Sequence, residues 1–282
     1  MTKSVKSNVN YIRSLIVSSI YHAGSGHPGG CLSCVDIVDY LYRYHMSYSF
    51  LDCDNVSRDR FIMSKGHCVP TIYAVFCDME YISLSELKTL RKINSRLQGH
   101  SHRVAFPQVE VSTGSLAQGF SFAIGESLGL KLQGYSNNVY AMIGDGELQE
   151  GQIWEGAMFA AHHNLGNLCT IVDYNKMHSD DLNENIIKLE PLQNKWESFG
   201  WNVFNIDGHN PNQIREVFSA AMSKENQKPS VVIAHTIKGK GVSYMESIPS
   251  WHGSVKLTEE DCRKALKDLE CTDNEIEVLM SA

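Results

Sequence analysis

The sequence predicts an α/β fold, a doubly wound and mostly parallel sheet with helices on both faces. Short apolar runs typical of buried strands alternate along the chain with longer segments of helical periodicity. Loops rich in Gly, His and Asp follow these strands or precede the helices, where open α/β sheets bind ligands. Because no internal repeat or low-complexity linker divides the 282 residues, we expect a single domain over 1–282, with 256–282 as a short helical tail.

The expected elements of the amino-terminal half are mostly helices. Apolar side chains recur at helical intervals from Val5 to Ile20, and a Gly-rich loop over 23–30 separates this helix from the next. The run from Arg60 to Ser64 is expected to form a short strand. The expected helical regions are 4–22, 31–45, two pieces within 71–98, and 120–130.

Four apolar runs predict strands in the carboxyl-terminal half, and helical segments separate them. The expected strands are 139–143, 168–172, 201–206 and 229–234. The expected helices are 149–163, which is rich in Ala, Glu and Met, and 211–223, which begins with Pro. Thr258 and Thr272 are expected to cap two short polar helices in the tail.

Composition and charge exclude several classes of partner. The apolar content of 43% suffices for a large core. A formal net charge of −7 without a Lys/Arg cluster argues against nucleic acid or an anionic membrane as the main partner. No apolar run approaches the ~20 residues of a membrane span, and residues 1–10 are polar without a secretory pattern. We therefore expect a cytoplasmic protein.

The eight cysteines are scattered, and only Cys31 and Cys34 form a CxxC pair. No second Cys/His pair at zinc spacing accompanies them, and a disulfide is not expected in a reducing compartment. We interpret both residues as small hydrophobic side chains of the core.

The segment around Asp145 carries the clearest chemical signal. Gly144-Asp145-Gly146 follows one expected strand, and Asn175 follows the next, 175 − 145 = 30 residues later, which is the length of one strand-helix-strand crossover. The two side chains can therefore meet at one sheet edge, beside the amino end of a helix that attracts anions. Oxygen ligands that leave positions open for phosphate suit Mg²⁺. The alternative is a plain turn, because Asp is common between glycines.

Six motifs, in chain order, resemble the amino-terminal, diphosphate-binding domain of transketolase, a thiamine diphosphate enzyme family. The resemblance covers nearly the whole chain, and its length and ending are similar to those of the amino-terminal subunit of a split transketolase. The motifs are Ser25-Gly-His-Pro-Gly29, Ser64-Lys-Gly-His67, Gln98-Gly-His100, Ser112-Thr-Gly-Ser-Leu116, Gly144-Asp-Gly146 with Asn175, and His235-Thr-Ile-Lys-Gly-Lys-Gly241 with Trp251-His-Gly253.

This resemblance implies two cofactors, thiamine diphosphate and Mg²⁺, for which Ca²⁺ or Mn²⁺ can substitute. The implied metal ligands are the side chains of Asp145 and Asn175 and the backbone carbonyl of Met177. The implied catalytic residues are His27, His67, His100 and His252. The implied cofactor-binding residues are His67, Gly114, Ser115, Leu116, Gly144, Asp145, Gly146, Glu150, Asn175, Lys238 and His252.

The resemblance also implies a reaction and a partner. The reaction is transfer of a two-carbon ketol unit from a ketose or its phosphate to an aldose or its phosphate. Because no segment resembles the pyrimidine-binding domain, a carboxyl-terminal subunit would supply the catalytic Glu, with two copies of each subunit in an α2β2 assembly. By the same resemblance His27 and His100 would bind substrate hydroxyls, and Glu150 would join a carboxylate network between subunits.

Several positions depart from the family pattern. Lys176 replaces a usual Gly, Ser179 an apolar residue, and Asp181 a frequent Gly, so the metal loop is expected to differ in detail. Ser101-His102 replaces a Pro-acid pair and Ala117 a usual Gly. The identity of the donor and acceptor sugars therefore stays open, and a specialised pathway is as plausible as the pentose phosphate pathway.

Three alternatives remain open at this point. Deoxyxylulose-phosphate synthase and the α subunits of 2-oxo acid dehydrogenases share Gly-Asp-Gly…Asn, although Ser-Gly-His-Pro-Gly and Ser-Lys-Gly-His favour ketol transfer. A catalytically silent interaction subunit could keep the fold, but the retention of Asp145, Asn175 and the histidines argues against it. A nucleotide-binding dehydrogenase is disfavoured because no G-x-G-x-x-G follows the first strand.

Overall fold

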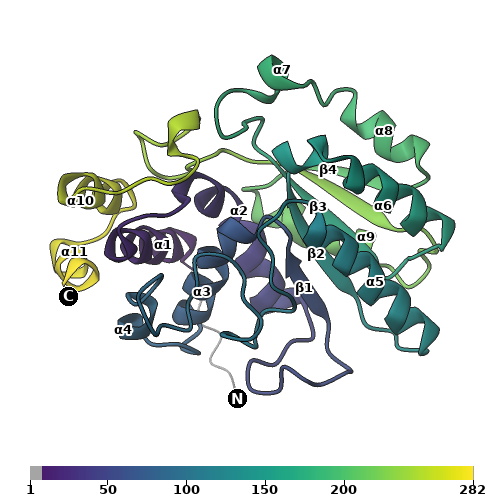
Figure 1. The fold of residues 1–282 in the computed structure, drawn as a ribbon, viewed down its shortest axis with the longest axis horizontal. Coiled ribbons are helices and arrows are strands. Elements are labelled where there is room, and N and C mark those ends of the chain that lie inside the picture. Colours follow the sequence, from purple (N-terminus) through teal and green to yellow (C-terminus); the bar gives the residue numbers. More distant parts are fainter. Residues whose placement is uncertain (1–7, 282) are drawn as a thin grey trace.

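The computed structural model describes residues 8–281 and contains one five-stranded, entirely parallel sheet (Figure 1). The strand order is β1-β2-β3-β5-β4, and each of the four pairings is parallel. The strands are β1 (Arg60–Met63), β2 (Val139–Gly144), β3 (Leu168–Tyr174), β4 (Asn202–Asp207) and β5 (Ser230–His235). The predicted fold class is confirmed, and all five expected strands are present within one or two residues.

Each face of the sheet carries its own apolar layer, because alternate residues of a strand point to opposite faces. In β2, Tyr140 and Met142 belong to one core cluster, whereas Ala141 and Ile143 belong to the other. Helices on both faces cover these layers (Figure 1). Those of the first cluster are α1 (Val9–Ala23), α2 (Pro28–Tyr40), α3 (Val69–Asp78) and α9 (Pro211–Ala221), and those of the second are α5 (Gln118–Leu132), α6 (Gly151–His162) and α8 (Leu192–Ser198).

The tail forms the two expected helices, α10 (Glu259–Asp268) and α11 (Asp273–Met280). Each begins with a complete capping box, in which Thr258 and Asp261, or Thr272 and Glu275, satisfy each other's backbone N–H groups. Both helices pack against α1, where the Ser18 hydroxyl donates to a backbone carbonyl of α11 at 2.7 Å. The prediction of a helical tail is therefore confirmed.

Helix boundaries differ from the expectation in three places. The helix expected over 31–45 begins already at Pro28, and its last turn, Leu41–His45, is π-helical. The two helical pieces expected within 71–98 are present as α3 and α4 (Leu84–Leu87), but α4, whose N-cap is Ser83, is only a single turn, and Arg91 and Asn94 beyond it take positive φ values. Residues 4–7 of the first expected helix lie outside the described residues.

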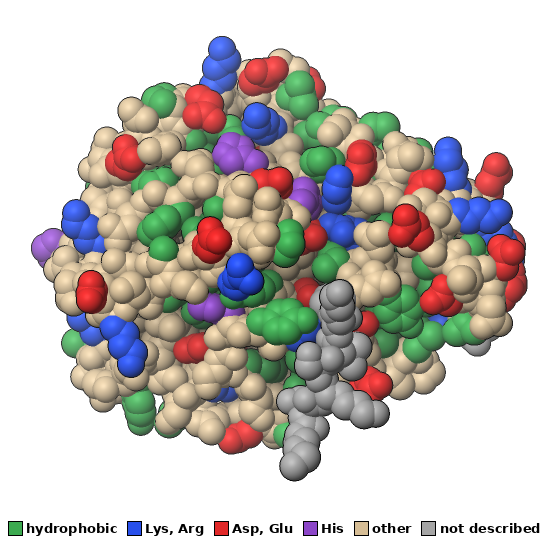
Figure 2. All heavy atoms as spheres, turned by 180° about the vertical axis from the view of Figure 1, so that it is seen from behind, with side chains coloured by type: hydrophobic (Ala, Val, Ile, Leu, Met, Phe, Trp, Pro, Cys, Tyr) green, Lys and Arg blue, Asp and Glu red, His purple; other side chains and the backbone are tan. Residues whose placement is uncertain are grey.

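Short elements complete the chain and include some that the sequence did not indicate. The 3₁₀ turns are Gly66–Cys68, Gly146–Gln149 and Pro249–Trp251, and α7 (Asn183–Ile186) is a further single turn. Along residues 8–281, none of the helices combines the length and the apolar character needed to cross a membrane. Acidic and basic side chains are interspersed over the face drawn in Figure 2, without a continuous basic patch.

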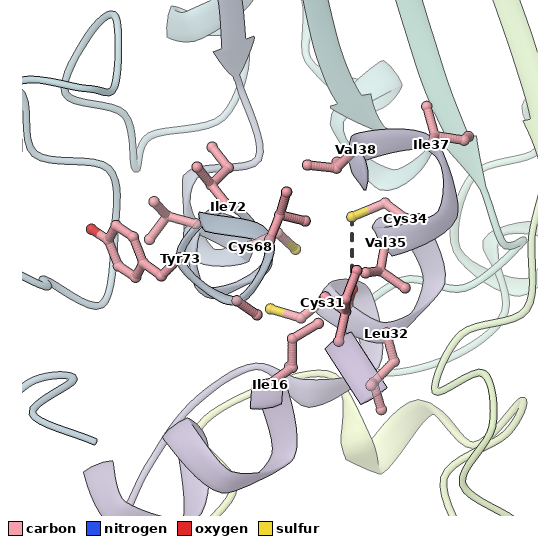
Figure 3. Close-up of a cluster of buried hydrophobic side chains, with 14 of the residues drawn as sticks. Ile16, Cys31, Leu32, Cys34, Val35, Ile37, Val38, Cys68, Ile72 and Tyr73 are labelled. Atoms are coloured by element: carbon pink, nitrogen blue, oxygen red, sulfur yellow. Dashed lines mark hydrogen bonds between the residues drawn. The ribbon is translucent and has the colours of Figure 1, made fainter. Parts of the chain in front are cut away.

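The interpretation of the CxxC pair as core residues is confirmed. Cys31 and Cys34 are fully buried, and Figure 3 shows them among apolar side chains of α1, α2 and α3. All eight cysteines are free thiols. Among the described residues, no group of three or more His, Cys, Asp or Glu side chains is arranged to hold a metal ion. A metal site would therefore need amide or backbone oxygens.

Candidate active site

A cavity of about 190 Å³ opens at the carboxyl edge of the sheet. The register aligns Gly144 with Asp173 and Tyr174 with His235, so the loops after β2, β3 and β5 leave the sheet side by side. These loops meet the Gly-rich loop before α2 and the loop after β1. The lining residues are His27, Gly30, Lys65, His67, His100, Gly114, Leu116, Gly144, Asp145, Gly146, Glu147, Asp173, Asn175, Met177, His178, Ser179, Lys238 and His252.

Asp145 contacts the loop that carries Asn175, as expected from the crossover. Its side chain is 2% exposed, and its two oxygens accept from the backbone N–H groups of Gly146 at 2.8 Å and Lys176 at 2.5 Å. Lys176 has a φ of 66°. This is the left-handed region that glycine enters freely, so a lysine here costs about 1–2 kcal/mol but leaves the loop in place.

Asn175 and Met177, together with Asp145, form an oxygen-rich part of the cavity wall, called the metal corner below. The Asn175 amide nitrogen donates to Asp173 at 3.3 Å, and its oxygen accepts from the Met177 N–H at 3.2 Å. The Met177 carbonyl points toward the ammonium group of Lys238 at 3.5 Å, and that group also donates to the carbonyl of His178 at 2.7 Å. The three oxygens expected to bind a metal therefore lie on adjoining parts of one cavity wall.

The ionisable side chains in and beside the metal corner differ in how well a partner of opposite charge balances them. Burial, together with the nearby charge of Asp173, raises the pKa of Asp145 to about 7. Burial would also raise the pKa of Asp173, but the ion pair with Lys65 and several hydrogen bonds hold it below its ordinary value. Burial lowers the pKa of Lys238 to about 8, although both carboxylates oppose this shift. A divalent cation would keep the Asp145 carboxylate ionised, so these residues fit Mg²⁺.

Four histidines from four separate loops line the same cavity. His27 is central, with its ring centroid 4.9 Å from that of His67, 5.8 Å from His100 and 5.9 Å from His252. A Cβ at Gly253 would overlap with the His27 imidazole, so only glycine allows this approach. The four predicted catalytic histidines are thus brought together.

Burial keeps these imidazoles neutral. It lowers the pKa of His27 to about 4 and that of His252 to about 3, and the charges of Arg91 and Lys238, respectively, add to the effect. The pKa values of His67 and His100 are lowered for the same reason. The Nδ1 atoms of His27 and His252 are buried without a hydrogen-bond partner. Buried polar atoms are normally paired, so these two nitrogens point to a ligand.

The loop expected to contact the cofactor ring lies along another wall. Gly114 and Leu116 line the cavity, but Ser115 is exposed and does not. The loop is fixed by Thr113, whose hydroxyl donates to the Met63 carbonyl at 2.8 Å. Glu150 is also exposed and outside the cavity, at the start of α6. The structure therefore does not bring Ser115 or Glu150 into the cavity formed by this chain alone.

Sequence reasoning missed a buried carboxylate, Glu147. It is 1% exposed and accepts from the Ser64 hydroxyl at 2.5 Å, from the N–H of Ala117 at 2.7 Å, and from the N–H of Gly144 at 3.0 Å. It thereby ties together the loops after β1, before α5 and after β2. Its position one turn beyond Gly144 was the only available signal. Other lining residues that were not predicted are Gly30, Lys65, Asp173, His178 and Ser179.

Comparison with known proteins places this cavity in a family. Residues 4–278 match the family described as "Transketolase, thiamine diphosphate binding domain". The chain is 40% identical to the 6-deoxy-6-sulfo-D-fructose transketolase subunit SqwG of Clostridium sp. (strain MSTE9), over 93% of this chain and 94% of that protein. It is 37% identical to one of the apulose-4-phosphate transketolase subunits of Phocaeicola vulgatus, over 88% of each.

Solved structures agree with these sequence matches. The transketolase of Campylobacter jejuni is similar with a TM-score of 0.86 and 29% identity, over 93% of this chain but 42% of that longer one. The chain thus spans nearly all of two curated subunits and less than half of this single-chain transketolase. The predicted family and the thiamine diphosphate-binding fold are confirmed. The chain belongs to the transketolase family, whose thiamine diphosphate binding domain it contains.

Proposed function

We propose that this chain is the amino-terminal subunit of a two-subunit transketolase, which transfers a two-carbon ketol unit from a ketose or its phosphate to an aldose or its phosphate. The observation that carries the proposal is the meeting of Asp145, Asn175 and the Met177 carbonyl beside four neutral histidines in one cavity. The two similar subunits are named for transfer from unusual ketoses. A ketose donor is therefore proposed here too.

In this proposal Asp145, Asn175 and the Met177 carbonyl hold Mg²⁺. Three protein oxygens suit Mg²⁺, because this ion keeps its other positions for water and phosphate oxygens. Lys238 now points toward two carbonyls of the same loop, and it would turn toward the diphosphate when the metal occupies the corner. Ca²⁺ and Mn²⁺ also accept oxygen ligands and are expected to substitute.

This chain also offers hydrogen-bond donors that would hold the diphosphate. His67, His252 and Lys238 can donate to its oxygens, and Gly144 and Gly146 allow close approach of the backbone. Gly114, Ser115 and Leu116 are proposed to lie along the aminopyrimidine ring. Ser115 is exposed in this chain, so we assign it a contact that forms only in the complete enzyme.

Bound thiamine diphosphate supplies the electron sink that makes a carbon–carbon bond next to a carbonyl cleavable. The residues of this chain bind and orient the sugar around it. His27 and His100, being neutral, can each accept a hydroxyl proton at one ring nitrogen while donating from the other. His67 and His252 are proposed to stabilise negative charge near the reacting carbon by hydrogen bonding.

The proposed enzyme needs a second subunit. A carboxyl-terminal, pyrimidine-binding chain would contribute the catalytic Glu and close the cavity, in an α2β2 assembly. Exposed Glu150, at the start of α6, would enter the carboxylate network across that interface. We further propose that residues 1–282 act as a single domain and that the enzyme is cytoplasmic.

A matched pair of variants tests this assignment. Two-carbon transfer would be measured in the assembled pair of subunits with thiamine diphosphate and Mg²⁺. Asp145→Ala should abolish transfer with assembly intact, whereas Asp180→Ala should leave it unchanged, because the Asp180 side chain is 87% exposed on the same loop. Equal activity of wild type and Asp145→Ala would contradict the metal assignment. Absence of transfer in a wild-type pair that binds both cofactors would favour the alternative of a silent subunit.

A further inference from the structure

Asp173 is a fully buried carboxylate at the carboxyl end of β3, the central strand of the sheet. It accepts hydrogen bonds from four side chains. The donors are the Ser33 hydroxyl at 2.6 Å, the Lys65 ammonium at 2.5 Å, the Asn175 amide at 3.3 Å and the Thr236 hydroxyl. Ser33, Lys65 and Asn175 donate to Oδ2 and Thr236 donates to Oδ1, so both oxygens of the carboxylate are engaged.

The four donors come from four different segments, and each segment carries a residue of the proposed site. Ser33 belongs to α2, which begins directly after His27, and Lys65 precedes His67 by two positions. Thr236 precedes Lys238 by two positions, and Asn175 is itself a proposed metal ligand. We propose that Asp173 is a positioning residue, which joins these loops and fixes the orientation of the Asn175 amide toward Mg²⁺. The inference rests on the function proposed above.

The orientation of the Asn175 amide follows from its two neighbours. An ionised carboxylate can only accept a hydrogen bond, and a backbone N–H can only donate one. The amide nitrogen must therefore face Asp173, and the amide oxygen must face the Met177 N–H and the cavity. A flipped amide would lose both hydrogen bonds and turn its nitrogen, which cannot bind a cation, toward the metal corner.

Lys65 forms an ion pair with this carboxylate, so the two buried charges balance. The side chains of Lys65 and Asp173 are 3% and 0% exposed, and the ammonium group also donates to the Gly30 carbonyl at 3.1 Å. Removing one partner of such a buried pair is strongly destabilising, whereas replacing both partners often costs little stability. The pair therefore anchors the loop after β1 to the carboxyl end of β3, where Asp173 also contacts Asn175.

The test removes both charges together, so that no unpaired ion is left buried. In Asp173→Asn with Lys65→Met, residue 173 can donate as well as accept, and the Asn175 amide is free to flip. The Kd of Mg²⁺ would be measured calorimetrically at saturating thiamine diphosphate, with the full chain assembled with its partner subunit. Partners of this outer-shell kind typically change metal affinity 10–100-fold, so we expect Mg²⁺ to bind 10–100-fold more weakly. The two lost charges have opposite effects on a nearby cation, so a variant that keeps both charges is also needed to separate the loss of orientation from electrostatics.

Two further variants distinguish the loss of the Asn175 orientation from a general loss of stability. Arg58→Met with Glu110→Gln removes a buried ion pair outside the cavity lining and should leave the Mg²⁺ affinity within twofold. Ser33→Ala with Thr236→Val removes two neutral donors to Asp173 but no charge. In this variant the Asp173 carboxylate loses two of its four donors and can shift away from the Asn175 amide, so we expect a loss of at least threefold in Mg²⁺ affinity, and this result decides if the first double variant does not fold.

The outcomes separate this inference from the proposed function. If the wild-type assembly binds neither Mg²⁺ nor thiamine diphosphate, the proposed function itself fails. If the wild type binds both and the Asp173 variants match its Mg²⁺ affinity, the positioning role is overturned while the function stands. Equal losses of Mg²⁺ affinity in the Asp173→Asn/Lys65→Met and Arg58→Met/Glu110→Gln variants would also overturn the positioning role, because they would indicate a general effect on stability.

Discussion

Asp145→Asn should make the metal-free protein more stable at high pH while it removes Mg²⁺ binding. The carboxyl of Asp145 has an ordinary pKa of 3.8, which burial and the charge of Asp173 raise to about 7 in the folded chain. Between these values the folded state holds a proton that the unfolded state releases. The stability that this proton gives is fully present below the unfolded pKa and is lost as the pH rises through the folded pKa.

The size of the effect follows from the same shift. From about pH 5 to pH 7 the free energy of unfolding falls by about 1.4 kcal/mol per pH unit, and above pH 7 it levels off. Ionisation of folded Asp145 therefore costs about 3 kcal/mol of stability between about pH 5 and pH 8. Asn does not titrate, so the variant escapes this loss. The amide also gives up one of the two N–H hydrogen bonds to residue 145, which costs about 1–3 kcal/mol at every pH. The pH-dependent part is therefore the informative quantity.

The assay is urea unfolding of wild type and Asp145→Asn without metal at both pH values. We expect the stability of the variant relative to wild type to rise by about 3 kcal/mol from pH 5 to pH 8. Mg²⁺ with thiamine diphosphate should stabilise wild type at pH 8 and leave the variant unchanged. A stability difference that does not vary with pH, or that varies in the opposite sense, would refute the electrostatic reasoning.

Three further results are expected. Glu147→Ala should lower the free energy of unfolding by about 3–6 kcal/mol, because it leaves three buried donors unpaired, and Glu147→Gln should lower it less. A loss below about 1 kcal/mol in urea unfolding of Glu147→Ala would count against this hydrogen-bond network. Gly253→Ala should displace His27 and reduce two-carbon transfer at least tenfold, at a cost of about 1–3 kcal/mol in stability, whereas unaltered kinetics would show that the His27 position is not critical. Chelation of Mg²⁺ by EDTA should abolish transfer and lower the melting temperature of the thiamine diphosphate-loaded enzyme, and Ca²⁺ or Mn²⁺ should restore both; activity that survives chelation would exclude an essential metal.

The sheet was predictable because its physical origin is local. Strands buried on both faces need continuous apolar runs, and such runs stand out between polar loops, as in 139–143 and 168–172. The capping boxes at Thr258 and Thr272 are local as well. The second helical piece expected within 71–98 is shorter than its expected span, and Arg91 and Asn94 beyond it adopt left-handed backbone conformations, which residues other than glycine rarely signal in a sequence.

The candidate site was predictable only in part, for a related reason. Asp145 and Asn175 lie on one crossover, so their meeting follows from topology. The histidines come from four loops, and singly each is a weak signal. Glu147 gave little signal and Asp173 none, since a Glu or Asp is usually exposed, and their donors lie up to 140 residues away in sequence. Only the folded chain shows that these carboxylates hold the loops together.

The central claim is that this chain provides the diphosphate and metal half of a transketolase site and needs a second subunit for turnover. The most direct measurement is thiamine diphosphate- and Mg²⁺-dependent two-carbon transfer from a ketose phosphate to an aldose phosphate as the candidate carboxyl-terminal subunit is titrated into a fixed amount of this chain. We expect no transfer by this chain alone and activity that saturates at one partner per chain. Full activity of the chain alone, or none in an assembled mixture that binds both cofactors, would contradict the account.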